Sequence, residues 1–553
     1  MASSGNFMTW SSLWSCDSVS YPPSPDVFSG GNCRYSSSNS NNGFGATHSF
    51  LSGKWYWEVY IVANGNKQLI LGLVTPETKV VTDQLWNRDG IYGVTSGSGV
   101  GYKLINQSPG FTEIDGFDDV ANGDIVQLAF DRDNYKLWVG RNNTWLESGN
   151  PAGNSNPLIG SSDFTFQGGA VMPVIGQGSG STFTMVLNAG QDDTFGGEIT
   201  GAGNADENGH GVFKYTPPSG FLAPCSANLS LATELDPAEG NQPNKYFDAV
   251  TYTGNGSTQN IDSLNFQPDI VWIKNRSQSD SWVNQNSVLG VGKTQAIDSS
   301  APVVSETDCI TAFNSDGFSL GNDHKVNASS ENYVAYCFKE SADAGIDIVT
   351  YSGDGGTQAV SHSLGVKPKM IWMMLNTGSG VDGTCFMDTS SMGTGKGVFM
   401  SLSNGAQSTT YVSATSSSSF SVTSSMNSSS RTYFAYLFAE KEGFSKYGEF
   451  EGNGNADGPF IYTGFRPRLV FCKAIDASEN WQVRDTARFT SNTGSQGRFY
   501  FNSSAAEGAA STASPIDFLS NGFKVRGSNS EINSNTIIYG AWGDVPFKYN
   551  NTF

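Results

Sequence analysis

Residues 252–256 read Tyr252-Thr253-Gly254-Asn255-Gly256, and a related stretch returns twice in the chain. The second copy begins at Tyr351 and the third at Phe450, so each begins 99 residues after the one before. In each unit a proline with an apolar run follows this stretch, and an aromatic strand stands near the end of the unit. The prolines are Pro268, Pro368 and Pro467, and the strands are residues 333–338, 433–438 and 537–542. This shared order predicts three tandem copies of one β module.

The repeat also sets the predicted domain boundaries. These are 1–228 for a first domain, 229–245 for a linker, and 246–345, 346–445 and 446–553 for the three β repeats. Each repeat is long enough to hold a small core of its own. The linker contains Pro237 and Pro243 among polar residues, which is typical of an extended connector.

Composition excludes several classes of partner. Lys plus Arg number 31 and Asp plus Glu 51, for a formal charge of −20, whereas nucleic acids and anionic membranes attract basic surfaces. We therefore expect no nucleic-acid partner, and we expect no membrane insertion because no run of about eighteen apolar residues occurs. The first residues lack the basic and apolar regions of a signal peptide, which predicts synthesis in a cytosol. Seven scattered cysteines without CxxC spacing predict neither a disulfide framework nor a zinc site.

The first domain carries the pattern of a β-sandwich. Residues 53–61 alternate apolar and polar side chains, as a half-buried strand does, and residues 69–74 form a continuous apolar run. Residues 125–139 hold two apolar runs separated by the polar turn Asp131-Arg132-Asp133-Asn134, which predicts a hairpin. The spacing of these strands favours a sandwich of two sheets.

These residues resemble the SPRY family, a concanavalin-like β-sandwich, from Phe28 to Gln191. The matching motifs are GKWYWEV at 53–59, GDIVQLAFDRDNYKLWVGRNNTW at 123–145 and MPVIGQGSGSTFTMVLNAGQ at 172–191. The resemblance implies a binding module without catalysis, whose loops present the ligand surface. A SPRY-like domain followed by Tyr-Thr-Pro-Pro-Ser-Gly-Phe at 215–221 and then by such repeats is similar to structural proteins of marine bacteriophages.

Three motifs suggest chemistry but lack essential residues. Gly290-Val291-Gly292-Lys293-Thr294 has Ser287 where a phosphate-binding loop needs another glycine. The turn beginning at Asp131 lacks the sixth-position glycine and the final glutamate of a calcium loop. A second set of acids could coordinate calcium but is interpreted as solvated turn residues, namely Asp115, Asp118, Asp119, Asp192 and Asp193. Glu58 stands alone in its strand, without the second carboxylate of a glycosidase, and is expected to face outward or lie at the rim.

We therefore predict an all-β protein: an N-terminal SPRY-like β-sandwich followed by three tandem related β-sandwich modules. The expected function is that of a bacteriophage virion protein, a tail fibre or adhesin-like appendage that binds the host surface. The alternatives are a capsid decoration or tail-tube component and, from another class, a polysaccharide depolymerase. Four loop residues are the expected ligand contacts, namely Trp86, Tyr102, Asn142 and Trp145, because exposed rings beside Gly- and Asn-rich turns can stack on sugars.

The remaining expectations concern cofactors and partners. We expect no catalytic residues, no metal and no cofactor. Expected partners are other virion proteins and a host surface glycan or receptor. Strands with few charges, such as residues 433–438, leave sheet edges that need a cover, which favours a homo-oligomer and, by analogy with phage fibres, a trimer.

Overall fold

The computed structural model describes residues 6–16, 28–37, 43–65, 69–75, 90–97, 100–105, 112–118, 120–164, 170–177, 183–393, 395–492, 494–512 and 514–549. The backbone forms two compact units, Met1–Ser230 with Phe460–Tyr462, and Leu231–Pro459 with Thr463–Phe553. The regular secondary structure of both units is almost entirely antiparallel strand, which confirms the predicted all-β class. In the described part of the chain no helix is long and apolar enough to cross a membrane.

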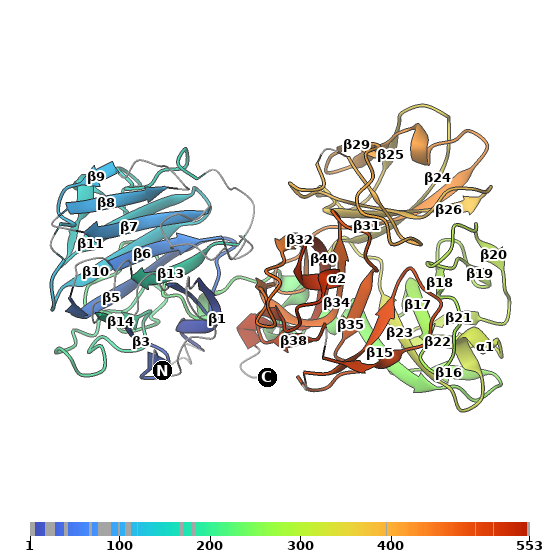
Figure 1. Ribbon diagram of the computed structural model, residues 1–553, viewed down its shortest axis with the longest axis horizontal. Coiled ribbons are helices and arrows are strands. Elements are labelled where there is room, and N and C mark those ends of the chain that lie inside the picture. The colour runs from blue at the N-terminus through green and yellow to red at the C-terminus, as the bar shows by residue number, and fades with distance from the viewer. Residues whose placement is uncertain are drawn as a thin grey trace. The chain divides into compact units, whose positions relative to one another are not determined.

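The first unit is a sandwich of two sheets, each with seven strands among its described residues (Figure 1). One sheet has the order β1 (Trp10–Cys16), β4 (Gly43–Ala46), β13 (Met172–Gln177), β6 (Leu69–Val74), β7 (Ile91–Gly97), β8 (Val100–Ile105), β9 (Thr112–Ile114). The other has the order β12 (Thr144–Trp145), β11 (Lys136–Arg141), β10 (Ile125–Asp131), β5 (Lys54–Asn64), β14 (Phe183–Asn188), β3 (Arg34–Ser37), β2 (Phe28–Ser29). Aromatic rings join the two sheets, as Tyr35 of β3 and Phe44 of β4 do with centroids 5.4 Å apart.

Short 3-10 turns complete this unit and begin the next. They are η3 (Leu146–Ser148), η4 (Ser226–Asn228), η5 (Thr233–Leu235), η6 (Pro237–Glu239) and η7 (Pro243–Lys245). The last three lie in the segment expected to be an extended connector. That segment instead turns repeatedly, and Leu235 is fully buried in the core of the second unit.

The second unit contains three large sheets with the same strand order. The first is β15 (Phe247–Thr253), β23 (Asn332–Phe338), β17 (Ile270–Asn275), β18 (Val283–Asn286). The second is β24 (Ile346–Ser352), β31 (Thr432–Phe438), β26 (Met370–Thr377), β27 (Thr384–Met387), β28 (Val398–Phe399). The third is β32 (Ser445–Glu451), β40 (Thr536–Pro546), β34 (Phe465–Ala474), β35 (Gln482–Asp485), β36 (Gln496–Tyr500), β37 (Gly508–Ser511).

Smaller elements accompany each large sheet. In the first module they are β16 (Gln259–Ile261), β19 (Lys293–Thr294), β20 (Val304–Ser305), β21 (Ile310–Asn314), β22 (Gly317–Leu320) and α1 (His324–Asn327). In the second they are β25 (Gln358–Ser361), β29 (Val412–Thr415), β30 (Ser419–Val422) and η8 (Ser424–Met426). In the third they are β33 (Phe460–Tyr462), β38 (Ile516–Leu519), β39 (Gly522–Val525), α2 (Ser530–Asn533) and η9 (Phe547–Tyr549).

The strand registers fix which residues of the three modules correspond. Phe338 pairs with Phe247 and Ile270, Phe438 with Ile346 and Met370, and Trp542 with Ser445 and Leu469. The repeat prolines occupy corresponding positions, because each stands two residues before one of these partners: Pro268 before Ile270, Pro368 before Met370 and Pro467 before Leu469. In the third module the proline lies inside β34, opposite Gly543, where the register shifts. A β-bulge of this kind is where a strand tolerates proline.

Alternate residues of the central strands serve two different cores. In β31, Phe434, Tyr436 and Phe438 face a core shared by all three modules, while Tyr433, Ala435 and Leu437 face the second module's own core. The strands β23 and β17 divide in the same way. Side chains of a strand point alternately to its two faces, so a strand buried on both faces reads as a continuous apolar run. The strand expected to be an open edge, residues 433–438, is instead a central strand between β24 and β26.

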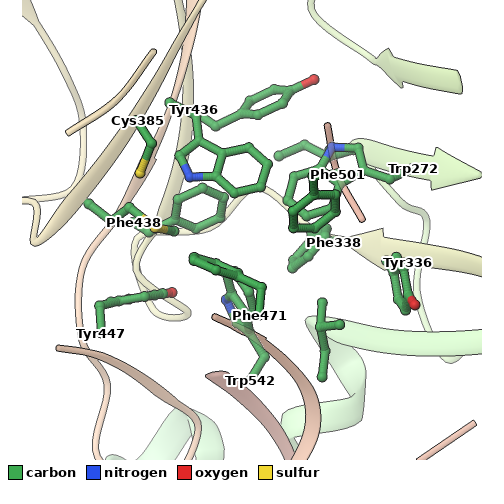
Figure 2. Close-up of a cluster of buried hydrophobic side chains, with 14 of the residues drawn as sticks. Trp272, Tyr336, Phe338, Cys385, Tyr436, Phe438, Tyr447, Phe471, Phe501 and Trp542 are labelled. Atoms are coloured by element: carbon green, nitrogen blue, oxygen red, sulfur yellow. The ribbon is translucent and has the colours of Figure 1, made fainter. Parts of the chain in front are cut away.

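The shared core is an aromatic cluster to which every module contributes (Figure 2). Trp272 and Trp372 stack with centroids 4.7 Å apart and planes 9° apart, and Phe501 of the third module meets both rings edge-on. Trp542 lies against both Phe338 and Phe438. The modules are therefore not independent beads, because each large sheet buries one face against the other two modules.

Three backbone hydrogen bonds close this arrangement into a ring. Glu507 N donates to Arg276 O at 3.0 Å, Ala406 N to Ile475 O at 2.6 Å, and Val303 N to Asn376 O at 3.2 Å. The acceptors stand at corresponding positions, two residues beyond Lys274, Lys473 and Met374. The bonds join the first module to the third, the third to the second, and the second to the first. We call each of these contacts a seam.

Candidate functional site

The four loop residues predicted to contact a ligand have different surroundings. Trp86 lies outside the described residues. Tyr102 is half-buried in β8, opposite Thr95 and Glu113. Its neighbour Gly101 lies against the backbone of Phe117, where an added Cβ would be 2.8 Å from the Phe117 carbonyl carbon. Position 101 therefore requires glycine.

Asn142 lies in the turn between β11 and β12, and Trp145 is the last residue of β12. Asn142 is exposed, yet its side chain accepts a hydrogen bond from Ile125 N at 2.9 Å and donates to Asp124 at 2.7 Å. It also has a positive φ of 49°, which asparagine tolerates, so a structural role explains this residue. Trp145 is half-buried against the cluster on the outer face of the sheet. Arg141, which precedes Asn142, donates a hydrogen bond from Nη1 to Asp118 O at 2.9 Å.

Glu58 shares the outer face of β5 with Tyr56 but is buried beneath residues 214–215, so the expectation of an exposed or rim carboxylate is wrong. It accepts hydrogen bonds from Tyr56 Oη (2.9 Å), Asn188 Nδ2 (3.2 Å), Lys214 N (2.9 Å) and Tyr215 N (2.8 Å). Burial raises the pKa of Glu58, and these four bonds act in the opposite direction. The carboxylate thus fastens the segment at 214–215 over β5, a central strand of its sheet.

The repeated stretches, Gly-Asn-Gly in the first and third modules and Gly-Asp-Gly in the second, are turns held by a buried asparagine. Asn327 ends α1, accepts from Asn255 N at 2.9 Å and donates to Gly321 O at 2.8 Å and to Ser257 O. Asn427 and Asn533 hold the corresponding turns in the other two modules through the same amide groups. The stretch that defines the repeat is therefore structural.

The two nucleotide- and calcium-like motifs are hairpin turns. Gly290 and Gly292 have positive φ between β18 and β19, and Lys293 donates to Ser305 Oγ at 2.9 Å. Asp131 is buried, caps its own turn through Asn134 and pairs with Lys54 at 3.4 Å. Neither motif has the helix or the free ligand oxygens that its chemistry requires.

Glu306, Cys309 and Asp323 form a compact group within the described residues, with one ligand atom of each within 4.8 Å of the others. Lys325 pairs with Glu306 and lies 3.9 Å from Asp323, so an ammonium already balances the carboxylates. Asp323 also caps α1 by accepting from Lys325 N at 2.7 Å. Burial raises the pKa of Cys309, with the neighbouring acids adding to it. The group is best explained as an internal ion pair, not a metal site.

The most unusual electrostatic site is a set of three carboxylates between the first and second modules, which we call the carboxylate joint. Glu340 Oε1 accepts from Ile348 N at 3.1 Å, across the turn that links the modules. Asp269 Oδ2 accepts from Glu340 N at 2.8 Å. Burial raises the pKa of Glu340 to about 7, helped by the adjoining carboxylates of Asp347 and Asp269. Among the described residues these three carboxylates make no ion pair.

The two corresponding joints carry cations. Between the second and third modules, Glu440 accepts from Tyr447 N at 3.1 Å, and Lys446 Nζ lies 3.3 Å from its Oε1. Between the third and first modules, Arg468 pairs with Asp248 at 3.0 Å. Burial raises the pKa of Asp544 at that joint, and Arg468 counteracts the rise. The carboxylate joint is therefore the exception in an otherwise balanced set.

The carboxylate joint can be found in the sequence by comparing residues at corresponding positions of the three repeats. Glu340, Glu440 and Asp544 each stand two residues after the central aromatic residue, and Asp347 corresponds to Lys446. Only the fold shows that these positions meet across module boundaries, because the side chains belong to different repeats.

Comparisons with known proteins identify a family and yield two solved structures of low similarity. Residues 242–546, more than half of the chain, match the model of a family described as "Domain of unknown function (DUF7483)". Among solved structures, the chain is similar to the TRIM65 PSpry domain at 14% identity, covering 33% of this chain and 90% of that chain with a TM-score of 0.23. It is also similar to the SPRY domain of human HERC1 at 14% identity, covering 30% of this chain and 95% of that chain with a TM-score of 0.21. No curated protein matches the sequence.

Proposed function

Because the chain belongs to the DUF7483 family, whose description assigns no activity, we propose a function from its architecture: a structural protein of a bacteriophage virion. In this proposal it forms a tail fibre or adhesin-like appendage that displays loops to the host surface. It is made in the host cytoplasm and assembles with other virion proteins. The order of a SPRY-like domain and β repeats, similar to that of marine phage proteins, supports the assignment.

The observation that carries the proposal is the closed ring of the three repeats. One chain supplies three large sheets that bury their inner faces in a single aromatic core. Such a unit needs no partner to cover these apolar faces and is suited to a durable particle exposed to the environment. Loops on a rigid scaffold are where proteins commonly bind their ligands. The scaffold therefore suits display better than chemistry.

The proposed binding surface includes Tyr102 of β8 and Trp145 of β12 in the first unit, and its ligand is a host surface glycan or receptor. Tyr102 and Trp145 are half-buried rings, so each keeps a part that a ligand can contact. A well-placed aromatic contact contributes roughly 1–3 kcal/mol at an interface. Tyr102→Ala should weaken attachment to host cells without unfolding the sandwich, whereas the unchanged attachment of this variant would remove Tyr102 from the surface.

The test of the function is the location and the binding of the intact protein. Antibodies against the chain, imaged on virions, should label the tail, and the purified chain should compete with virions for adsorption to host cells. Label confined to the head would favour a capsid decoration protein. Hydrolysis of host polysaccharide by the purified chain would favour the depolymerase.

The homotrimer remains a prediction, but one argument for it fails. The edge that it was expected to cover, β31, is a central strand already paired on both sides. Light scattering of the full chain at micromolar concentration would decide whether copies associate without other virion proteins.

A further inference from the structure

The pair formed by the first and second modules differs from the other two pairs in how its seam is held. Trp282 Nε1 of the first module donates to Tyr500 O of the third at 2.9 Å, and Trp481 Nε1 of the third donates to Phe399 O of the second at 2.8 Å. At the corresponding position the second module has Gly383. This seam therefore lacks the indole that crosses the other two.

A lysine that crosses the other seams is missing in the same place. Lys274 Nζ donates to Ser504 O at 2.9 Å, and Lys473 Nζ to Ser403 O at 3.0 Å. The second module has Met374 at this position, close to Asn284 of the first. Tyr436 compensates in part, since its hydroxyl donates to Asn284 Oδ1 at 2.6 Å.

The joint between the same two modules is the one with three carboxylates. Asp347 accepts from Ser363 N and Oγ, and Asp269 accepts from Ser287 Oγ at 2.8 Å. The nearby Lys339 does not face them, because its ammonium lies over the ring of Tyr246, 5.9 Å from the centroid. Like charges this close repel unless a proton is shared between them.

We propose that the contact between the first and second modules is a proton-dependent latch built into the ring. With Glu340 protonated, its carboxyl group donates to Asp347 and the joint is closed. With all three carboxylates ionised, their repulsion loosens the joint, and the weaker seam of the same pair opens with it. The other two pairs stay closed, because Lys446 and Arg468 balance their carboxylates.

The linkage has a definite sign. A carboxyl group whose pKa is higher in the folded protein binds its proton more tightly when folded, so its stabilising effect is greatest in acid. That effect is lost as the pH rises from the ordinary glutamate value to the raised pKa of about 7. The latch is therefore closed in weak acid and loosened above neutrality.

Hydrogen–deuterium exchange of the full chain, corrected for the intrinsic exchange rate, tests the latch. From about pH 5.5 to about pH 8.5, protection of the Ile348 and Val303 amides should fall about thirtyfold, because a group with a pKa of about 7 loses about 1.5 pH units of linkage over this range. The corresponding amides of Tyr447, Ala406 and Glu507, at the other joint and seams, should keep their protection. Equal behaviour of the two sets would overturn the proposal.

Two variants and a control sharpen the result. Glu340→Gln removes the titrating group, and Asp347→Lys installs the cation found at Lys446, so both should abolish the dependence on pH at Ile348 and Val303. Glu440→Gln, at the corresponding position of the balanced joint, should leave that dependence intact. Dependence that persists in Glu340→Gln would refute the role of this carboxyl group, and the comparison of joints within the wild-type chain stands even if a variant fails to fold.

Discussion

Replacing Asn327 by alanine tests whether the buried asparagine of each module holds the repeat turn. The side chain is fully buried, accepts from Asn255 N at 2.9 Å and donates to Gly321 O at 2.8 Å. Alanine removes the amide and leaves these two backbone groups and Ser257 O without this partner. An unsatisfied buried polar group costs about 1–3 kcal/mol.

The three orphaned groups do not count equally. Gly321 is buried, so its carbonyl bears the full penalty, whereas Asn255 and Ser257 are exposed and their backbone groups can recover hydrogen bonds from water. With the lost side-chain packing added, we expect the free energy of unfolding of the second unit to fall by about 2–3 kcal/mol.

Urea denaturation of the full chain, followed by the fluorescence of the buried tryptophans in the shared core, measures the effect. Asn533→Ala should cost a similar amount, because Asn533 donates to the buried Gly527 O, whereas Asn427→Ala should cost less, because Asn427 donates to Gly356 O and Gly356 is exposed. Asn332→Ala is the matched control, since this exposed asparagine only accepts from Thr253 Oγ1 and should change stability by less than about 0.5 kcal/mol. A loss in the three buried variants no larger than in the control would refute the reasoning.

Three further outcomes are expected. Glu58→Ala should destabilise the first unit by roughly 3 kcal/mol, because the amides at 214–215 lose their buried acceptor, and a melting temperature equal to that of the wild type would contradict this. Trp481→Phe keeps an aromatic ring but removes the hydrogen bond to Phe399 O, so urea denaturation should show a loss of about 1–2 kcal/mol. Burial lowers the pKa of His48 to about 3. On acidification, His48 is therefore protonated at a higher pH in the unfolded chain than in the folded chain, so the folded protein should lose stability as the pH falls below about 6.5. Calorimetry should show a weaker dependence of stability on pH in His48→Gln.

Much of the fold can be predicted from local sequence pattern. The 99-residue recurrence indicates the repeats, because it can be read directly from the order of the residues. The proline before each apolar run and the alternation at 53–61 indicate strands, because these patterns depend only on neighbouring residues. The continuous apolar run at 433–438 also indicates a buried strand. Both faces of that strand are indeed buried, which explains why polar residues do not alternate within it.

The tertiary structure alone decides what those faces meet. The run at 433–438 gives no sign that one face packs on residues from three repeats, and the interpretation of it as an exposed edge was wrong for this reason. Glu58 has the pattern of an outward-facing residue, but a segment more than 150 residues later covers it.

The candidate site shows the same division. The sequence contains Glu340, Asp347 and Asp269 as unremarkable acids in two different repeats. The pKa of Glu340 is raised because burial at the turn between the two modules places this carboxyl group beside Asp347 and Asp269 without a cation, while Lys446 stands at the corresponding joint. Whether a carboxylate has a cation beside it depends on which residues meet in the folded chain. The local sequence pattern shows only which residues are neighbours along the chain.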